Sequence, residues 1–279
     1  MKVQYAGATD VGKVRDHNED SFAIVPEQDL ILVCDGMGGH AAGEVASQLG
    51  VETITTIVKD RDFALFTADV FSYPESITPA GKLLVGAISV ANQRIIDRAK
   101  ASTTHLGMGT TVVACCFENG IVSVCHVGDS RAYLIRDGRA TCLTNDHTTV
   151  GDLVRMRVLP PNKVRTHAQR SILTRGLGLA LFVQPDLAQH KLKDDDRLIL
   201  CSDGVWSVIQ DDEFAQLAAE VKGMQALSRA LIDLALERQT DDNASAIAIH
   251  IQCLTPSPAG SERRRSRSWP YLLRKLWSF

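Results

Sequence analysis

Short apolar runs that end at turn residues recur along the chain and predict β-strands. Two runs, residues 30–34 and 198–201, are continuously apolar, as strands buried on both faces are. An Asp-Gly pair follows each of them, Asp35-Gly36 in one case and Asp203-Gly204 in the other. A carboxylate followed by glycine at a strand end leaves bare backbone that can approach an ion or a phosphate. For either pair alone, an ordinary tight turn is the competing interpretation.

The other strand candidates are neighbours in the sequence and are joined by tight turns. Glu118-Asn119-Gly120 and Asp137-Gly138 are hairpin signals, and hairpins produce antiparallel sheets. The segments 171–174 and 186–192 are short and ambiguous. The expected strands cover residues 2–8, 21–25, 30–34, 110–117, 121–127, 131–136, 139–143, 197–201 and 244–251.

Apolar residues at helical spacing predict the helices. In residues 41–59, for example, Val45, Leu49, Ile54 and Val58 share this spacing. The expected helices cover residues 41–59, 79–100, 146–161, 211–221 and 224–238. Strands therefore come in runs and helices in pairs, which favours an α+β layered domain over a doubly wound parallel sheet. We expect one domain over residues 1–253.

The composition is that of a globular protein, with 45% hydrophobic and 23% charged residues in a chain of 279. The net charge of -3 is too small to indicate a partner. The seven cysteines form no CxxC pair, and their odd number argues against a disulfide framework, so we expect free thiols. With no signal peptide or long apolar run in the sequence, we expect a cytoplasmic protein.

Residues 254–279 differ from the rest and are expected to form a flexible tail. This segment is basic at 263–267 and aromatic at Trp269, Tyr271, Trp277 and Phe279. Such a segment could lie on an anionic membrane surface, holding the protein there peripherally, or dock on a protein partner. A disordered solubilising tail is the alternative, and nucleic acid is not expected as a partner.

Several carboxylates stand at strand ends, where a sheet would bring them together. No histidine or cysteine keeps metal-ligand spacing with them, and oxygen-only ligands favour Mg²⁺ or Mn²⁺. Two such ions can activate a water for attack on a phosphoryl group, and Arg15 has the guanidinium fork to hold its oxygens. Acidic residues also populate ordinary turns, which is the competing interpretation. The carboxylates concerned are Glu19, Asp20, Asp35, Asp129, Asp203 and Asp242.

The order of these motifs resembles that of the metal-dependent Ser/Thr protein phosphatase family, type 2C, in its compact bacterial form. The resemblance runs from residue 3 to residue 251. Its strings are Arg15-Asp16-His17-Asn18-Glu19-Asp20, Asp35-Gly36-Met37-Gly38-Gly39-His40, Gly109-Thr110-Thr111, Gly128-Asp129-Ser130-Arg131-Ala132-Tyr133, Leu143-Thr144-Asn145-Asp146-His147, Ser202-Asp203-Gly204 and Asp242-Asn243.

The resemblance implies a four-layer αββα sandwich, two central antiparallel sheets flanked by helices, with two Mn²⁺ or Mg²⁺ ions at one end. By position, Asp35 would bridge both ions. Asp203 and Asp242 would complete the first ion's ligands, and Glu19 and the Gly36 carbonyl would serve the second. Asp20 would orient waters, and Arg15 would hold the substrate phosphate during direct attack by water, without a phosphoenzyme.

Two departures from the family pattern concern the proton donor and a third ion. Some members have a histidine as candidate general acid where this chain has Met37, so the candidate here is His40, which a structural role at a helix N-terminus explains equally well. Asp129 matches one ligand of a third ion, but Ser207 replaces the other. We therefore expect the third site to be weak or absent.

Residues 147–170 correspond to the family's mobile flap, which resembles a substrate-recognition element. The flap is basic, which suits an acidic or phosphorylated partner, although solvated surface charge explains it as well. Asp146 and His147, just before it, are expected at a helix N-terminus. The basic residues are Arg155, Arg157, Lys163, Arg165 and Arg170.

The function expected from the resemblance is hydrolysis of phosphoserine and phosphothreonine in proteins, by a monomer that reverses a cognate Ser/Thr kinase. Its partners would then be phosphorylated proteins. One rival is a pseudophosphatase that binds phosphoproteins without turnover. Another is a different two-metal phosphoesterase such as a nuclease, which would need a basic groove that the overall charge does not favour.

Overall fold

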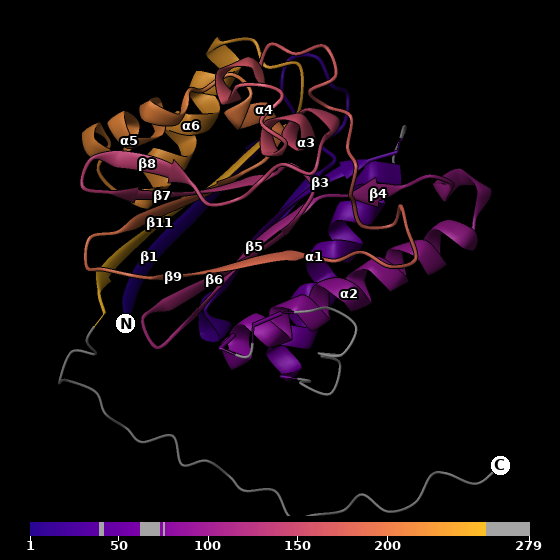
Figure 1. Ribbon diagram of the computed structural model, residues 1–279, viewed down its shortest axis with the longest axis horizontal. Coiled ribbons are helices and arrows are strands. Elements are labelled where there is room, and N and C mark those ends of the chain that lie inside the picture. Colours follow the sequence, from indigo (N-terminus) through magenta and orange to yellow (C-terminus); the bar gives the residue numbers. More distant parts are fainter. Residues whose placement is uncertain (39–41, 62–72, 75, 255–279) are drawn as a thin grey trace, which may run out of the picture.

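The computed structural model describes residues 1–38, 42–61, 73–74 and 76–254, and its strands form two stacked antiparallel sheets (Figure 1). One sheet has the order β1-β11-β10-β7-β8, made of Lys2–Asp10, Ala244–Cys253, Arg197–Cys201, Arg131–Arg136 and Arg139–Cys142. The other has the order β2-β3-β5-β6-β9, made of Asp20–Val25, Leu30–Met37, Val112–Glu118, Ile121–Val127 and Asp186–Lys191. The short strand β4 (Gly109–Thr110) pairs with β3.

Helices cover the outer face of each sheet (Figure 1). Helices α1 (Ala42–Asp60) and α2 (Pro79–Lys100) lie on the β3 sheet, while α5 (Asp211–Glu220) and α6 (Met224–Glu237) lie on the β11 sheet. Shorter helices join the elements. They are α3 (Thr149–Arg155), α4 (Asp203–Trp206) and the 3₁₀ turns η1 (Pro26–Gln28), η3 (Thr103–His105) and η4 (Pro161–Lys163).

The apolar core has three layers, which explains why the central strands are apolar at consecutive positions. Along β3, Ile31 and Val33 face the other sheet, whereas Leu30 and Leu32 face α1 and α2. Strand β10 divides its side chains in the same way between the inter-sheet layer and the α5–α6 side. Strands covered on both faces need no polar positions. The predicted four-layer αββα sandwich is confirmed.

The predicted helix at 146–161 is wrong in extent, because α3 covers only Thr149–Arg155. Its N-cap is Thr148, whose hydroxyl accepts from the Gly151 N–H at 2.9 Å. Asp146 is therefore not the cap. Both of its carboxylate oxygens instead accept hydrogen bonds from Arg131, at 2.9 and 2.7 Å. A tertiary ion pair has replaced the local capping role that the sequence indicates.

The predicted strand 110–117 is interrupted at Thr111. The Asp35 N–H donates to the Thr111 hydroxyl at 3.1 Å, and the Thr111 N–H donates to the Asp35 carbonyl at 2.8 Å. These bonds bend the chain, so that β4 pairs with the end of β3 and β5 with its beginning. The ambiguous segment 171–174 forms no strand and contributes one isolated bridge, between Leu173 and Thr148.

The first and last strands pair with each other along their length, from Lys2 opposite Cys253 to Asp10 opposite Ala244. Cys34, Cys115, Cys116, Cys125, Cys142 and Cys201 are free thiols, as predicted. Among the described residues, no helix combines the length and apolar character needed to span a membrane. His40 and residues 255–279 lie outside the described part, so the predictions for the candidate acid and for most of the tail are not tested here.

Candidate metal centre

The predicted carboxylates converge at one end of the sandwich. Asp35 and Gly36 lie near the end of β3, Asp203 opens α4 after β10, and Asp242 stands two residues before β11. Asp129 lies in the turn between β6 and β7. Together with Arg15 and Glu19, these residues line one cleft of about 500 Å³.

Asp20 lies buried beside this cleft, opposite Asp35 in the β2–β3 register. The Ser202 hydroxyl donates to Asp20 Oδ2 at 2.7 Å and accepts from the Ser245 N–H at 3.0 Å. Ser202 and Ser245 belong to the other sheet's side of the sandwich, so this chain of bonds ties Asp20 across the two sheets. Because Asp20 is buried, its position suits a role in orienting neighbouring groups better than a role in contacting the substrate.

Asn243 fixes the loop that carries Arg15 and Glu19. Its side-chain oxygen accepts from the Glu19 N–H at 2.8 Å, and its amide nitrogen donates to the carbonyls of Val11 and His17 at 2.8 and 2.9 Å. The sequence analysis missed this role. The signal was present in the Asp242-Asn243 string, whose second residue has both a donor and an acceptor to offer.

Gly36 is a glycine because neighbouring backbone leaves no room for a side chain. A Cβ there would lie 2.1 Å from the Gly43 carbonyl oxygen and 2.6 Å from that of Glu19. The N-terminal turn of α1 thus closes directly on the end of β3, beside Asp35. This close approach keeps the backbone of Gly36 next to that of Glu19. The two residues could therefore offer oxygen ligands to the same metal ion.

The carboxylates of this cluster lie next to one another, with Asp20 and Asp129 buried and Asp35, Asp203 and Asp242 partly exposed to the cleft. Burial, followed by repulsion from neighbouring carboxylates, raises the pKa of Asp35 and of Asp203 well above the usual range. Burial also raises the pKa of Asp129 to about 7, with the Asp146 charge as the next cause. The pKa of Asp20 rises to about 6, again mainly through burial. Mutual repulsion therefore destabilises this cluster when its carboxylates are ionised.

Two further observations fit a divalent cation at this cluster. Asp203 Oδ1 is buried without a hydrogen-bond partner. The guanidinium of Arg15 also lines the cleft, and its NH2 group lies 2.8 Å from Asp242 Oδ2. Its charge pairs with Asp242 and does not compensate the charges of Asp35 and Asp203. Carboxylate and carbonyl oxygens are the ligands that Mg²⁺ and Mn²⁺ prefer. The residues present therefore fit the ions expected from the sequence.

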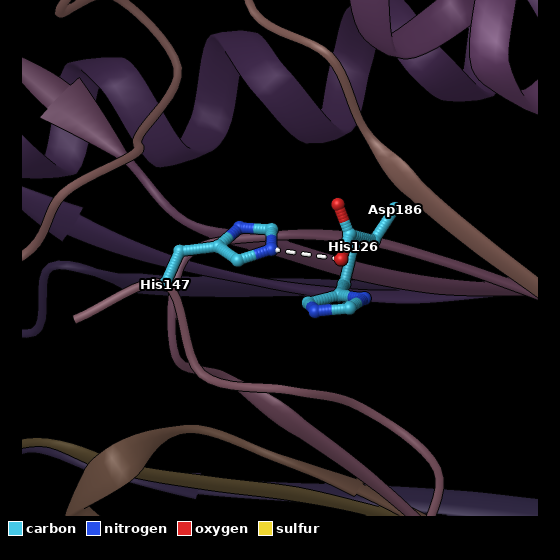
Figure 2. Close-up of side chains that lie close together, drawn as sticks. All are labelled: His126, His147 and Asp186. Carbon is cyan, nitrogen blue, oxygen red and sulfur yellow. Dashed lines mark ion pairs between the residues drawn. The ribbon is translucent and has the colours of Figure 1, made fainter. Parts of the chain in front are cut away.

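A second group of possible metal ligands, His126, His147 and Asp186, lies near the same end (Figure 2). Their ligand atoms lie within 4.8 Å of one another, and the imidazole rings stack with centroids 4.6 Å apart. The Gly128 N–H, however, donates to His147 Nδ1 at 3.1 Å. In a neutral ring the proton is then on Nε2, the atom that would have to bind the metal.

His147 Nε2 instead lies 3.3 Å from Asp186 Oδ2, without the alignment of a full hydrogen bond (Figure 2). Arg175 NH1 reaches Asp186 Oδ1 at 2.6 Å. Although burial favours the neutral acid, the contacts with His147 and Arg175 outweigh it and lower the pKa of Asp186. This group already contains a cation, Arg175, and its geometry argues against a metal.

The predicted basic flap is partly tied into the domain. Arg165 donates to the carbonyls of Trp206 and Ile209 at 2.9 and 3.1 Å and to Asp211 Oδ1 at 2.6 Å. The charge of Arg165 is therefore largely compensated by Asp211 and by backbone carbonyls of the domain itself. Just beyond the flap, Ser171 and Leu173 line the cleft and bring this segment to the candidate metal centre.

Comparisons with known proteins agree with this geometry. A family model described as Protein phosphatase 2C matches residues 12–238. The chain is 33% identical over 254 residues to the serine/threonine protein phosphatase PstP of Mycobacterium tuberculosis, covering 90% of this chain but 45% of that protein. It is also 33% identical to a putative protein phosphatase 2C-type of Streptococcus pyogenes, covering 87% of this chain and 95% of the relative.

Solved structures show the same relationship. The crystal structure of Mycobacterium tuberculosis PstP superimposes with a TM-score of 0.78 at 32% identity, covering 90% of this chain and 99% of that one. The catalytic domain of PstP in complex with two manganese ions gives a TM-score of 0.76 at 31% identity, with the same coverage. The chain spans about half the length of the curated PstP proteins that it matches. It belongs to the protein phosphatase 2C family.

Proposed function

We propose that this chain hydrolyses phosphoserine and phosphothreonine in proteins at a centre that holds two Mn²⁺ or Mg²⁺ ions. The observation that carries the proposal is the cluster of partly buried carboxylates, whose raised pKa values reflect a need for cations, in a cleft that Arg15 also lines. The catalytic domain of PstP, a relative of this chain, was solved in complex with two manganese ions, which supports the same assignment here.

The ligand assignment follows the family's pattern. Asp35 would serve both ions, Asp203 and Asp242 the first, and Glu19 with the Gly36 carbonyl the second. Bound ions of this kind lower the pKa of water and offset the charge on phosphate oxygens. Asp20, held by Ser202, would orient waters at the centre. Because Ser207 offers a neutral hydroxyl in place of a carboxylate, a third ion beside Asp129 would bind weakly or not at all.

Arg15, which lines the cleft, would hold the substrate phosphate. Its Nε and NH2 groups donate to the Asp241 carbonyl at 3.2 Å and to Asp242 Oδ2 at 2.8 Å, which fixes the plane of the guanidinium. The side chain is still 50% exposed, so the fork remains accessible to a ligand. A fixed guanidinium matches the oxygens of a phosphate with little loss of side-chain freedom on binding.

The proton for the leaving alkoxide does not come from Met37, which lines the cleft but has no proton to donate. The remaining candidates are His40 and water at the centre. A His40→Gln variant distinguishes them, because loss of a general acid lowers turnover of a serine phosphate far more than that of an activated aryl phosphate. Equal effects on both substrates would assign His40 a structural role.

The direct test of the function is metal-dependent hydrolysis. We expect purified protein with Mn²⁺ to hydrolyse both an aryl phosphate and a phosphothreonine peptide, and a chelator to stop both reactions. Asp203→Ala should abolish turnover, whereas Asp233→Ala, which removes an exposed carboxylate on α6, should not. Folded, metal-loaded protein that binds the peptide without any turnover would overturn the proposal in favour of a phosphoprotein-binding module.

We also propose the domain boundary near Cys253, with the tail beyond it. The pairing of Lys2 with Cys253 at the edge of the sheet supports this boundary. Deleting residues 256–279 should leave peptide turnover and the unfolding midpoint unchanged. Loss of folding would contradict the boundary.

Co-sedimentation of the intact chain and of the truncated protein with anionic and neutral vesicles tests the proposed peripheral membrane contact. Sedimentation velocity tests the expected monomer.

A further inference from the structure

One loop beside the cleft exposes large apolar side chains. Residues 177–184, called here the apolar loop, precede β9 and contain no charged residue. Leu179, Leu181 and Phe182 are 49%, 59% and 81% exposed, although such side chains are normally buried. An exposed group of this kind beside a polar cleft is typical of an interaction surface.

The apolar loop is held firmly by α2. Asn92 is buried, and its Nδ2 donates to the carbonyls of Ala180 and Leu181 at 2.9 and 3.3 Å. Its Oδ1 accepts from the Gly178 N–H at 2.8 Å. One buried side chain thus satisfies three backbone groups of the loop. The exposed side chains are therefore presented by an ordered backbone.

The ends of the loop are anchored as well. The backbone of Leu177 exchanges hydrogen bonds with that of Thr110, in β4, at 2.8 and 3.0 Å. Leu177 and Val183 are buried in the apolar core between the β3 sheet and helices α1 and α2. The loop turns between these anchors at Gly178, which has a φ of +87° and whose Cβ would lie 2.5 Å from Ile95 Cγ2.

The loop joins the candidate metal centre through Leu179. This side chain lines the same cleft as Asp35 and Arg15. It lies close to Met37, since a Cβ on Gly176 would approach both side chains, at 3.0 Å from Leu179 Cδ1 and 2.7 Å from Met37 Cε. One wall of the cleft is therefore apolar and leads outward onto the exposed loop.

We propose that the apolar loop binds an apolar side chain of the phosphoprotein substrate, next to the phosphorylated residue. The inference rests on the proposed function, because a phosphate held at the metal centre fixes where the rest of its chain leaves the cleft. Consecutive Cα atoms are about 3.8 Å apart, so only residues a few positions from the phosphorylated one can reach the loop. An uncharged, apolar surface selects leucine-like side chains over charged ones.

The test compares phosphothreonine peptides that differ only in one leucine, moved through the positions on either side of the phosphothreonine, with an all-serine parent. With the wild-type protein and Mn²⁺, we expect the best leucine peptide to exceed the parent in kcat/KM by about tenfold, the effect of burying one such side chain. The double variant Leu181→Ser/Phe182→Ser should lose this preference. Phe182→Leu, which keeps an apolar surface, should retain it.

Three controls accompany the peptides. Turnover of an aryl phosphate, which is too small to reach the loop, should stay within about twofold of wild type in every loop variant, because these side chains contribute binding and not chemistry. The variant Asp233→Ala changes an exposed side chain on α6, over the other sheet. It should keep the leucine preference. Sedimentation velocity of wild type and loop variant detects a dimer formed through the loop.

Several results would overturn the inference. They are equal kcat/KM for leucine and serine peptides, the same loss of preference in the Asp233→Ala control, or a wild-type dimer that the loop variant dissociates. If neither peptide nor aryl phosphate is turned over, the proposed function fails. The inference is then decided by direct titration of the peptides into Mn²⁺-loaded protein, where equal Kd values contradict it and tighter binding of a leucine peptide supports it.

Discussion

Two groups of partly buried titratable side chains at the same end of the sandwich behave in opposite ways. In the metal centre, burial and mutual repulsion raise the pKa of Asp35 and Asp203. In the network of Figure 2, burial has the same sign, but the contacts of Asp186 with His147 and Arg175 outweigh it and lower the pKa. The direction of the shift therefore separates carboxylates that need an external cation from those that already have one.

Arg131 and Asp146 form a second compensated pair close to the metal centre. Their side chains are 9% and 7% exposed and meet through two hydrogen bonds. The Arg131 guanidinium also stacks over Trp206, 3.5 Å from the ring centroid, and the Trp206 indole N–H donates to the Asp129 carbonyl at 2.8 Å. A compensated pair thus supports the backbone that carries Asp129. Removing charge from the two kinds of group should have different consequences.

The largest expected effect is on turnover. Asp35→Asn removes the carboxylate proposed to serve both ions and should lower kcat for an aryl phosphate with Mn²⁺ by about a thousandfold. Asp186→Asn is the matched change in the compensated network and should keep kcat within about tenfold, because no step of the reaction uses it. A similar loss in both variants would remove the distinction between the two groups.

The next largest effect is on folding, and here the compensated pair should be more sensitive. Arg131→Met leaves Asp146 as a buried, unpaired carboxylate and should lower the free energy of unfolding by about 3–5 kcal/mol. Urea unfolding measures the change. The matched variant Arg229→Met breaks the exposed pair with Asp233 and should leave the midpoint where it was. An Arg131→Met protein as stable as wild type would show that this pair does not hold the fold.

Metal binding should stabilise only the uncompensated cluster. At a Mn²⁺ concentration one hundred times Kd, the free energy of unfolding should rise by about 2.7 kcal/mol. In Asp35→Asn the metal effect should be lost, while the metal-free variant should be more stable than metal-free wild type, because a repelling carboxylate is gone. Thermal unfolding with Mn²⁺ and with chelator checks both signs. Full Mn²⁺ stabilisation of the variant would contradict the assignment.

The last effect, confined to acid pH, concerns His126. Burial, with the neighbouring His147 next, lowers the pKa of His126 from 6.5 to about 4, although the Asn145 carbonyl, Asp186 and Asp146 act in the other direction. Between these values the unfolded chain binds the proton more readily than the folded chain. This contribution to stability is therefore present above pH 6.5 and is lost as the pH falls toward 4, by about 3 kcal/mol, since each pKa unit corresponds to about 1.36 kcal/mol.

Urea unfolding between pH 4 and pH 7 measures this effect as the difference between wild type and His126→Asn, which cannot titrate. Taking the difference removes the contributions of the carboxylates that both proteins share. The two curves should converge toward pH 4. Curves that stay parallel over the whole range would mean that His126 keeps an ordinary pKa in the folded protein.

Much of the fold and of the candidate site could be predicted from local patterns. Continuous apolar runs at 30–34 and 198–201 indicated strands covered on both faces, and the inter-sheet and helix-facing layers account for them. Residues placed at strand ends by the sequence do line one cleft, apart from the buried Asp20 and from His40, outside the described part. Periodicity and turn residues act over a few positions, so they can be recognised without knowing the rest of the chain.

Contacts between distant residues explain what the sequence analysis missed. Asp146 looked like a helix cap, but Arg131, fifteen positions away, takes both of its oxygens. Asn243 looked like part of a motif, and only the structure shows it holding the loop of Glu19, 224 positions away. No local pattern distinguishes a capping aspartate from one that finds an arginine on another strand, because both are favourable and tertiary contacts decide between them.

By itself, the sequence determined an α+β layered domain and the oxygen-rich character of the site, because these follow from periodicity, turn chemistry and residue type. The ordered motif strings carried the family resemblance, which implied the αββα sandwich. The tertiary structure alone decided which carboxylates are compensated, and it alone revealed the stacked pair His126–His147 and the exposure of Phe182. The physical reason is that burial and charge compensation depend on neighbours in space. In this fold those neighbours come from two different sheets and from the helices that cover them.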